Sequence, residues 1–329
     1  MKVGIVPRYV IGVDIGGTKV AAGLVNEQGE IVFQLRKPMA AKGTAAEGLA
    51  AVKSAIDAVF AAKPEARPEI FHIGLCAPGP LDPIKGIIIN PPNVSCWRNY
   101  PLVEEIQRAY GLPVCLENDA KAAALAEVRW GAGRGYGIVF YATLGTGIGT
   151  GMILDGKIYH GRTGAAGEGG HVSIDYRGPR CACGKRGCIE ALAAGPAIAE
   201  RAREKLLAAN SPESKLLSLA HGDASAVTSE MVGEAFAAGD PIAKATLEDT
   251  ADLLTVWIGN IIDLLEPEII VIGGGVAKML APFFGRIRER LPEWCVNPTP
   301  LEIPIVHARY AGDSGIAGAA ALCEWDRTV

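Results

Sequence analysis

The sequence contains no apolar run of the length that a membrane-spanning helix needs. Its N-terminal segment also lacks an extended apolar stretch followed by a small-residue cleavage site, which a secretory signal would show. The 32 Lys and Arg residues are balanced by 36 Asp and Glu residues, and no basic run is long enough to follow a phosphate backbone. We therefore expect a cytoplasmic, globular protein that acts on a small molecule, with neither nucleic acid nor membrane as its partner.

The chain has no linker rich in Ser, Gly and Pro and no low-complexity tract. Its 329 residues, 49% of them hydrophobic, are enough for two lobes of ordinary domain size, which we expect to be tightly joined. We predict an α/β protein with a small N-terminal lobe over residues 1–118 and a large lobe over 119–311. A C-terminal helix within 312–329 is expected to pack back on the small lobe.

Short apolar segments that end in glycine or polar residues predict buried strands, and longer segments with apolar residues three and four apart predict helices. A threonine and glycine turn after residue 142 resembles the turn after residue 13, which indicates two related halves. A long helical region is expected over 189–265, and the segment 312–325 reads as an N-capped helix. The expected strands are 9–16, 19–25, 30–37, 70–79, 114–119, 136–145, 147–156, 268–276 and 302–309, and the other expected helices are 44–62 and 120–130.

One imidazole and three thiols occur close together, at His171, Cys181, Cys183 and Cys188. Structural zinc takes four nitrogen or sulfur ligands in a tetrahedron with no open position, so this set predicts a structural zinc site. The alternative is that the cysteines are disulfide-bonded or simply buried. Cys181 and Cys183 are too close in sequence to bridge easily, and three is an odd number, so zinc is favoured.

The remaining five cysteines are scattered among apolar neighbours, as expected for reduced, buried thiols. We assign no function to them from the sequence. They are Cys76, Cys96, Cys115, Cys295 and Cys323.

Three glycine turns directly follow apolar strands, at 14–19, 143–151 and 272–276. Glycines in such turns let backbone N–H groups approach an anion. None matches GxxxxGK[ST], and Thr150 and Met152 stand where GxGxxG would need glycine. Any one of them is consistent with a plain tight turn, but together they predict a cradle for a nucleotide polyphosphate.

Two acids stand at predicted strand ends, where α/β proteins place their chemistry. Asp14 is suited to orient hydrated Mg²⁺ against phosphates, or alternatively to accept a hydrogen bond from its own turn. Asp119 is suited to accept a proton from a sugar hydroxyl, or alternatively to cap the alanine-rich helix that follows. The sequence leaves both pairs of alternatives open.

Taken together, these motifs resemble the ROK family of sugar kinases, within the actin, hexokinase and Hsp70 superfamily of ATPases. The resemblance covers nearly the whole chain, and its cysteine and EGGH segments are the most specific. It implies a two-lobed actin-like ATPase (ribonuclease H-like) fold with an active-site cleft between the lobes and a structural zinc loop. The segments that carry it are DIGGTK, CAPGP, PNVSCW, LENDA, GTGIGTG, GEGGH, CACGKRGCIE, LEPEIIVIGGGV and GDSGIAGAA.

The resemblance further implies transfer of the γ-phosphate of ATP to a hexose, with Asp119 as general base and with Mg²⁺ and structural Zn²⁺ as metals. One ring nitrogen of His171 would bind zinc and the other a sugar hydroxyl. The residues implied at the sugar are Gly79, Asn93, Asn118, Asp119, Glu168, His171 and Glu190. Those expected at Mg²⁺ and the nucleotide are Asp14, Gly16, Gly17, Thr18, Lys19, Thr143, Gly145, Thr146, Gly147, Gly274 and Gly275.

Several alternatives remain open. Glucose, phosphorylated at its 6-hydroxyl, is the first expectation, but kinases for N-acetylglucosamine, N-acetylmannosamine, mannose and fructose share the motifs, and some relatives use polyphosphate. The family also includes sugar-binding repressors with a helix-turn-helix domain ahead of DIGGTK, whereas here thirteen residues that read as a strand precede Asp14. A zinc-stapled sugar-binding protein without catalysis is disfavoured because Asp119 is present. The resemblance also suggests a homodimer or homotetramer.

Overall fold

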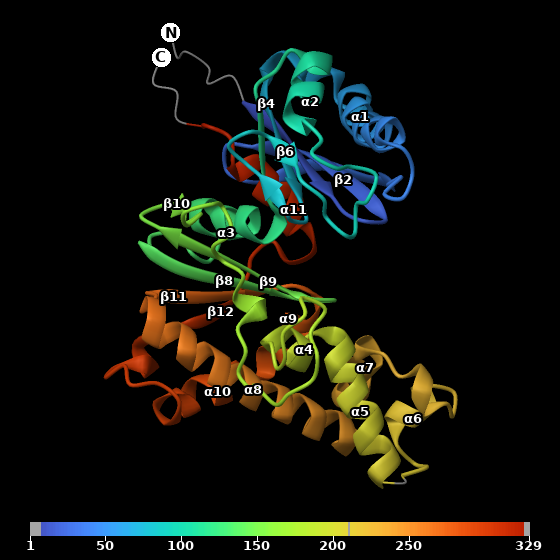
Figure 1. The fold of residues 1–329 in the computed structure, drawn as a ribbon, viewed down its shortest axis with the longest axis vertical. Helices are drawn as coiled ribbons and strands as arrows, with labels where there is room; N and C mark the ends of the chain where they lie inside the picture. Colours follow the sequence, from blue (N-terminus) through green and yellow to red (C-terminus); the bar gives the residue numbers. More distant parts are fainter. Residues whose placement is uncertain (1–7, 210, 326–329) are drawn as a thin grey trace. The chain divides into compact units, whose positions relative to one another are not determined.

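The computed structural model describes residues 8–209 and 211–325 (Figure 1). The predicted lobe ranges 1–118 and 312–329 therefore extend, at residues 1–7 and 326–329, outside the described residues. The chain forms two compact units. The first is Met1–Gly137, Gly151–Gly167 and Gly312–Val329, and the second is Ile138–Thr150 and Glu168–Ala311.

The first unit includes residues 119–137 and 151–167, which the sequence analysis placed in the other lobe. The reason lies in helix α3 (Asp119–Trp130), whose alanines pack closely against helix α11 (Ser314–Ala321). A Cβ atom on Gly318 of α11 would lie only 2.7 Å from the backbone carbon of Ala122. Such close packing of small residues places α3 with the first unit.

The first sheet has the strand order β3-β2-β1-β4-β7. Strands β1, β2 and β3 are joined as antiparallel neighbours, whereas β4 and β7 run parallel to β1. The carboxyl ends of β1, β4 and β7 therefore lie along one edge, which is where α/β sheets place ligand-binding residues. The bounds are β1 Tyr9–Ile15, β2 Lys19–Asn26, β3 Ile31–Pro38, β4 Ile70–Ala77 and β7 Val114–Asn118.

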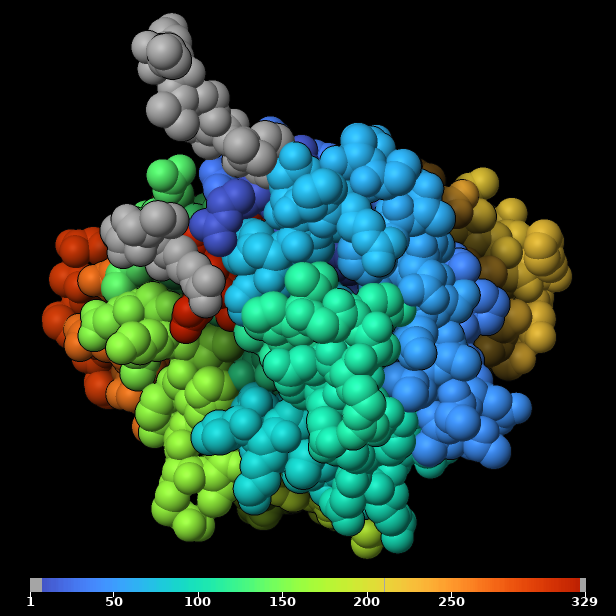
Figure 2. Space-filling model, turned by 90° about the horizontal axis from the view of Figure 1, so that it is seen from above, coloured from blue at the N-terminus to red at the C-terminus, as the bar shows by residue number. Residues whose placement is uncertain are grey.

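One face of this sheet is covered by helix α1 (Ala45–Ala62), which begins at a capping box formed by Thr44 and Glu47. Figure 2 shows the surface that α1, the 3-10 turn η1 (Pro64–Glu69) and helix α2 (Leu102–Tyr110) form on this unit. The sequence analysis did not predict α2 or the short hairpin of β5 (Leu81–Asp82) and β6 (Ile87–Ile88).

The other face of the sheet is covered by α11, which approaches β1 and β4 very closely. A Cβ atom on Gly74 would lie 1.8 Å from the carbonyl oxygen of Ala319, so only glycine fits there. The prediction that a side chain caps the start of this helix is wrong, because Asp313 lies at the cap position but makes no capping hydrogen bond. Its carboxylate instead accepts from Arg36 at 2.8 Å and from Gln34 at 3.2 Å.

The second sheet has the order β10-β9-β8-β11-β12, which repeats the order of the first sheet strand for strand. This repetition agrees with the two related halves predicted from the turns. Strand β8 runs parallel to β11, and β11 runs parallel to β12. The bounds are β8 Ile138–Leu144, β9 Ile148–Leu154, β10 Lys157–Ile158, β11 Ile269–Gly273 and β12 Ile305–His307.

Among its described residues, the helical region predicted over 189–265 forms five separate helices, of which α8 (Pro241–Leu265) is the longest. The side chain of Asp240 begins α8 by accepting from the backbone N–H groups of Ile242 and Ala243. The other helices of this unit are α4 Ile189–Ala193, α5 Gly195–Ala209, α6 Lys215–Leu219, α7 Ser229–Ala237, α9 Gly275–Leu280 and α10 Phe284–Arg290. Its 3-10 turns are η2 Gly169–His171, η3 Ala224–Ala226, η4 Ala281–Phe283, η5 Leu291–Glu293 and η6 Pro300–Glu302, and η7 Ala311–Asp313 leads into α11. Within the described ranges, no helix is both long and apolar enough to cross a membrane.

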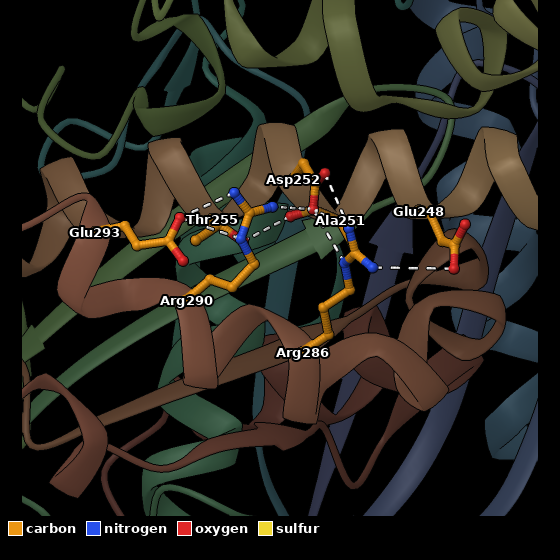
Figure 3. A network of polar contacts seen from close by, with 7 residues as sticks. All are labelled: Glu248, Ala251, Asp252, Thr255, Arg286, Arg290 and Glu293. Carbon is orange, nitrogen blue, oxygen red and sulfur yellow. Dashed lines mark hydrogen bonds and ion pairs between the residues drawn. The ribbon is translucent and has the colours of Figure 1, made fainter.

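Figure 3 shows the ion pairs that join α10 to α8. Arg286 and Arg290, one helical turn apart, both contact the Asp252 carboxylate, at 3.0 Å and 2.6 Å. Glu248 extends the network at 3.9 Å from Arg286, and Glu293 extends it at 3.0 Å from Arg290. Because these side chains reach solvent, each pair contributes little to stability and mainly fixes how α10 lies on α8.

Candidate functional site

Asp14 lies near the carboxyl end of β1 and is half-buried. Its Oδ1 accepts a hydrogen bond from the Cys76 thiol at 3.6 Å rather than from its own turn. A Cβ atom on Gly315 would lie 2.3 Å from the carboxyl carbon of Asp14, so the start of α11 packs directly on this carboxylate. Burial raises the pKa of Asp14, against a smaller lowering by the bond from Cys76.

The first glycine turn follows β1 and is closed by a hydrogen bond of 2.9 Å from Gly16 N to Lys19 O. Thr18 and Lys19 are exposed. A Cβ atom on Gly17 would lie 2.7 Å from the carbonyl oxygen of Asn93. The structure therefore brings Asn93, predicted at the sugar, beside Gly17, predicted at the phosphates.

The helix cap after β7 is Asn118 rather than Asp119. The Oδ1 atom of Asn118 accepts from the backbone N–H groups of Ala120 at 3.1 Å and Lys121 at 3.3 Å. Asp119 is the first residue of α3, and its Oδ1 accepts from Ala120 N at 2.8 Å. A Cβ atom on Gly79, which precedes a cis proline, would lie 3.9 Å from Asn118 Nδ2. Three of the residues predicted at the sugar thus lie together.

The Asp119 side chain reaches solvent, yet it is set among enough protein atoms to be strongly desolvated. Desolvation raises the pKa of Asp119 to about 6, and the negative charge of Asp14 adds to the increase. A carboxylate with this pKa is ionised at neutral pH but holds a proton more readily than an ordinary aspartate. That balance is the one a general base needs.

Two positioning residues near Asp119 were missed by the sequence analysis. Buried Glu117 lies 2.5 Å from His160 Nε2 through one carboxylate oxygen and accepts from Asn118 N at 2.8 Å through the other. Buried Lys121 donates to the carbonyl of Gly164 at 2.6 Å. These contacts hold residues 160–164 at the start of α3. No local spacing relates His160 to Glu117, so the sequence carried no signal for them.

In the second unit, His171, Cys181, Cys183 and Cys188 bring their ligand atoms within 4.8 Å of one another. His171 Nδ1 lies 3.6 Å from Cys181 Sγ, and Cys183 Sγ lies 3.7 Å from Cys188 Sγ. Zinc–sulfur bonds of about 2.3 Å in a tetrahedron place neighbouring sulfurs roughly 3.8 Å apart. The four residues therefore fit zinc.

Glu190, on α4, lies between this cluster and the glycine turn after β8. Its Oε1 is 3.7 Å from His171 Nδ1, and its Oε2 accepts from Ile148 N at 2.9 Å. A Cβ atom on Gly147 would lie 2.6 Å from the same Oε2, so glycine leaves room for the carboxylate. The arrangement joins Glu190, predicted at the sugar, to both the Cys3His cluster and the turn predicted at the phosphates.

Glu168 and His171 flank the turn η2, which is anchored at Gly169. The Gly169 N–H donates to Thr150 Oγ1 at 2.8 Å, and its carbonyl accepts from Trp257 Nε1 at 3.0 Å. The Glu168 side chain is exposed. Because His171 Nδ1 faces Cys181, Nε2 is the ring nitrogen that points away from the cysteine cluster.

A pocket of about 920 Å³ lies in the second unit beside the ends of β8 and β11. Gly145, Thr146 and Gly275 line it, and Thr143 stands at the end of β8. Gly274 has a φ of +90° and a Cβ there would lie 2.3 Å from Leu144 O, so this position requires glycine. The sequence analysis missed the helical residues of the pocket, because no short motif marks them. Among these are Ala199, Arg203, Phe236, Lys278 and Met279.

The ROK family profile matches residues 10–325. The chain is 33% identical over 313 residues to a glucokinase of Thermotoga maritima, covering 95% of this chain and 96% of that protein. It is 29% identical over 316 residues to an N-acetylmannosamine kinase of Salmonella typhi, covering 96% of this chain and 98% of that protein.

Among solved structures, the chain resembles the ROK family glucokinase from Streptomyces griseus in complex with glucose and AMPPNP, with a TM-score of 0.81. The two are 32% identical, and the match covers 96% of this chain and 99% of that one. This likeness, together with the two five-stranded sheets, confirms the expected α/β fold of the actin-like ATPase type.

Proposed function

Because the chain belongs to the ROK family, we propose that it is a sugar kinase that transfers the γ-phosphate of ATP to the 6-hydroxyl of glucose. The observation that carries the proposal is the environment of the Asp119 carboxylate. Its pKa is raised to about 6 by desolvation, and Asn118 serves as the helix cap, so capping does not require the Asp119 carboxylate. A role in capping the helix would by itself give no reason for the raised pKa of Asp119.

In the proposed reaction, Asp119 accepts the proton of the sugar hydroxyl while that oxygen forms its bond to the γ-phosphorus and the bond to ADP breaks. The Oδ1 atom is held by Ala120 N at 2.8 Å, which leaves Oδ2 for the proton. Phosphoryl transfer depends mainly on positioning and charge stabilisation, so the base needs only modest strength.

We propose that the sugar is held by Asn118, Glu168, His171 and Glu190, with Gly79 and Asn93 as further contacts. The Nδ2 of Asn118 is not used in capping, since only Oδ1 accepts from the helix. When bound by His171, Cys181, Cys183 and Cys188, zinc would supply a rigid tether with no open coordination position. His171 would then be held with Nε2 toward the sugar, and Glu190 is held by Ile148 N.

For the nucleotide, we propose that the pocket beside Gly275 takes the adenosine and that the turns Gly16–Lys19 and Thr143–Gly147 take the phosphates. Arg203 and Lys278 supply positive charge to the pocket. Asp14, the acid at the first turn, would hold Mg²⁺. We also retain the expectations of a homodimer or homotetramer and of a cytoplasmic location.

The substrate itself has a second candidate. The N-acetylmannosamine kinase of Salmonella typhi matches over nearly its whole length at 29% identity, against 33% for the glucokinase of Thermotoga maritima. The higher identity favours glucose. An acetamido sugar would need extra room at its second carbon, which makes the two sugars separable by assay.

The test is a coupled ADP-release assay with Mg·ATP against glucose, mannose, fructose, N-acetylglucosamine and N-acetylmannosamine. We expect the highest kcat/KM on glucose. A preference for N-acetylmannosamine would replace the substrate and keep the kinase. Failure to turn over any of the five sugars by folded, zinc-loaded protein would overturn the proposal. The Asp119→Asn variant, purified in parallel, controls for contaminating kinases.

Zinc is tested separately by metal analysis of Cys183→Ser, which removes an exposed ligand. We expect this variant to lose one equivalent of zinc relative to the wild type, together with most of its activity, because the loop bearing Glu168 and Glu190 loses its tether. The matched control is Cys295→Ser, whose oxygen can keep the contact to Leu291 O. Full activity of Cys183→Ser without that zinc would refute the tether.

A further inference from the structure

A second group of metal-ligating side chains lies in the first unit and includes none of the residues assigned above. It consists of His72 on β4, Cys115 on β7 and Cys323, two residues beyond α11. Their ligand atoms lie within 4.8 Å of one another. We propose that His72, Cys115 and Cys323 form a second binding site for a thiophilic metal ion, Zn²⁺, which ties the end of α11 to the sheet.

The strand register explains why His72 and Cys115 meet. Gly74 of β4 pairs with Cys115 of β7. Residues two apart on a strand point to the same face, so His72 shares the face of Gly74 and therefore that of Cys115. This is the face on which the carbonyl of Ala319 closely approaches Gly74, so α11 covers it (Figure 1). The chain leaving α11 then brings Cys323 onto the same face.

The donor set suits zinc. Two thiols and one imidazole are soft and borderline ligands of the kind that select Zn²⁺. With three protein ligands the tetrahedron would be completed by water, so this site would differ from the closed four-ligand cluster at His171 and would tie α11 to the sheet through its three protein bonds. Both cysteines are free thiols.

The cluster also holds a polar atom that the protein leaves unsatisfied. Within the described part of the chain, Nδ1 of His72 is buried without a hydrogen-bond partner. A buried polar group without a partner destabilises the folded state. A metal bound to one ring nitrogen would orient the imidazole so that the other nitrogen binds water or the neighbouring backbone, and this would offset the destabilisation.

The surroundings hold the three ligands on fixed elements. Cys323 is fully buried in an apolar cluster with Val10, Ile316 and Ala320. Its carbonyl accepts from Arg129 of α3 at 2.8 Å, which fixes the backbone beside the thiol. His72 and Cys115 are only half-buried, so the cluster is open to solvent on their side. This opening provides the path by which an ion would enter.

The proposed site would act on the part of the chain that packs on Asp14. Helix α11 has Gly315 against the Asp14 carboxylate near its first residue and Cys323 just beyond its last. A metal at Cys323 would fasten the far end of this helix to β4 and β7. The site is therefore a structural tether for α11, independent of the kinase reaction proposed above.

The experiment measures zinc per chain in the full-length protein after metal removal under reductant and reloading with Zn²⁺. We expect two equivalents in the wild type, two in Cys295→Ser, and one in each of Cys115→Ser, Cys323→Ser and Cys183→Ser. Co²⁺ loading should show thiolate charge-transfer absorbance that decreases in Cys115→Ser and Cys183→Ser and is additive between them. The same zinc content in the wild type and Cys115→Ser would overturn the second site.

Cys323 is fully buried, so His72→Gln takes the place of its serine variant if that variant does not fold. We expect His72→Gln to weaken competition with a chromophoric chelator for the second Zn²⁺ by at least about tenfold, while its unfolding temperature without metal stays near that of the wild type. The two cysteines could instead form a disulfide. Protein purified without reductant would then lack two free thiols, contain a linked Cys115–Cys323 peptide 2 Da lighter than the two reduced peptides, and fail to bind a second Zn²⁺. That result would overturn the proposal.

Discussion

The two sheets share one strand order, and both β1 and β8 lead into a glycine turn, but the sheets differ in the acidic residues near their strand ends. In the first sheet, β1 ends beside Asp14 and β7 leads into Asp119. In the second sheet, β8 leads into Gly145–Gly147 and β11 into Gly274 and Gly275. One topology thus carries carboxylates beside a glycine turn in the first half and glycine turns at the strand ends of the second half. The few residues after each strand, and not the strand order, decide the chemistry.

The difference predicts separable effects on catalysis. Carboxylates at the first sheet would act on the proton and the metal ion, so their loss should lower kcat. Glycines at the second sheet would make room for the nucleotide, so larger residues there should raise KM for ATP. If variants of either sheet changed kcat and KM for ATP alike, the two halves would not be specialised in this way.

The largest effect is expected for Asp119→Asn, which keeps the shape and the contact to Ala120 N but cannot take a proton. General-base catalysis contributes about 10²–10⁴-fold, so kcat should fall by that factor while sugar affinity, measured calorimetrically, changes little. Asp155→Asn, at an exposed turn residue with φ of +50°, is the matched control. A kcat within about threefold of the wild type would remove Asp119 from the role of base.

The pH dependence should follow the same carboxylate. The pKa of Asp119 is raised to about 6, and the base works only when it is deprotonated. Activity should therefore be constant above about pH 7 and, as the pH falls below about 6, kcat/KM should decrease by about tenfold per pH unit. Circular dichroism at pH 5 separates this titration from acid unfolding. A profile that stays flat down to pH 5 in folded protein would contradict the assignment.

In the second sheet, Gly275→Leu should raise KM for ATP by about tenfold with little change in KM for the sugar, since the side chain would occupy the nucleotide pocket. A Cβ atom at Gly275 meets nothing within 4 Å, so the protein should fold. Gly285→Leu is the matched control, because its Cβ also meets nothing within 4 Å and it lies outside the pocket. Equal KM values in the two variants would place the nucleotide elsewhere.

The smallest effect is expected away from both sets of strand ends. Arg286→Ala removes the ion pairs of this residue with Glu248 and Asp252 between α10 and α8. Because these groups reach solvent, the free energy of unfolding should fall by less than about 1 kcal/mol. The control is Arg288→Ala, which loses no ion pair among the described residues. A loss above about 2 kcal/mol by urea unfolding would show a cooperative network.

The features predicted well from the sequence were those whose residues lie close together in the chain. The helix predicted over 44–62, the strand β1 and the glycine turn after it follow from neighbours within a few positions. The Cys3His set spans residues 171–188, and the structure does bring its four ligand atoms together. Even local reasoning was wrong at Asp313, because Arg36, from a distant strand, competes for the carboxylate that would cap α11.

The sequence by itself determined most strands, the helices α1, α3 and α11, the glycine turns and the Cys3His cluster, because apolar periodicity and short spacing are local properties of the chain. Only the tertiary structure decided that His160 meets Glu117 and that His72 and Cys115 meet Cys323. It also decided that Asn118, and not Asp119, caps α3. Those contacts depend on strand register and on the close packing of α11 against Gly74, and no window of neighbouring residues contains that information.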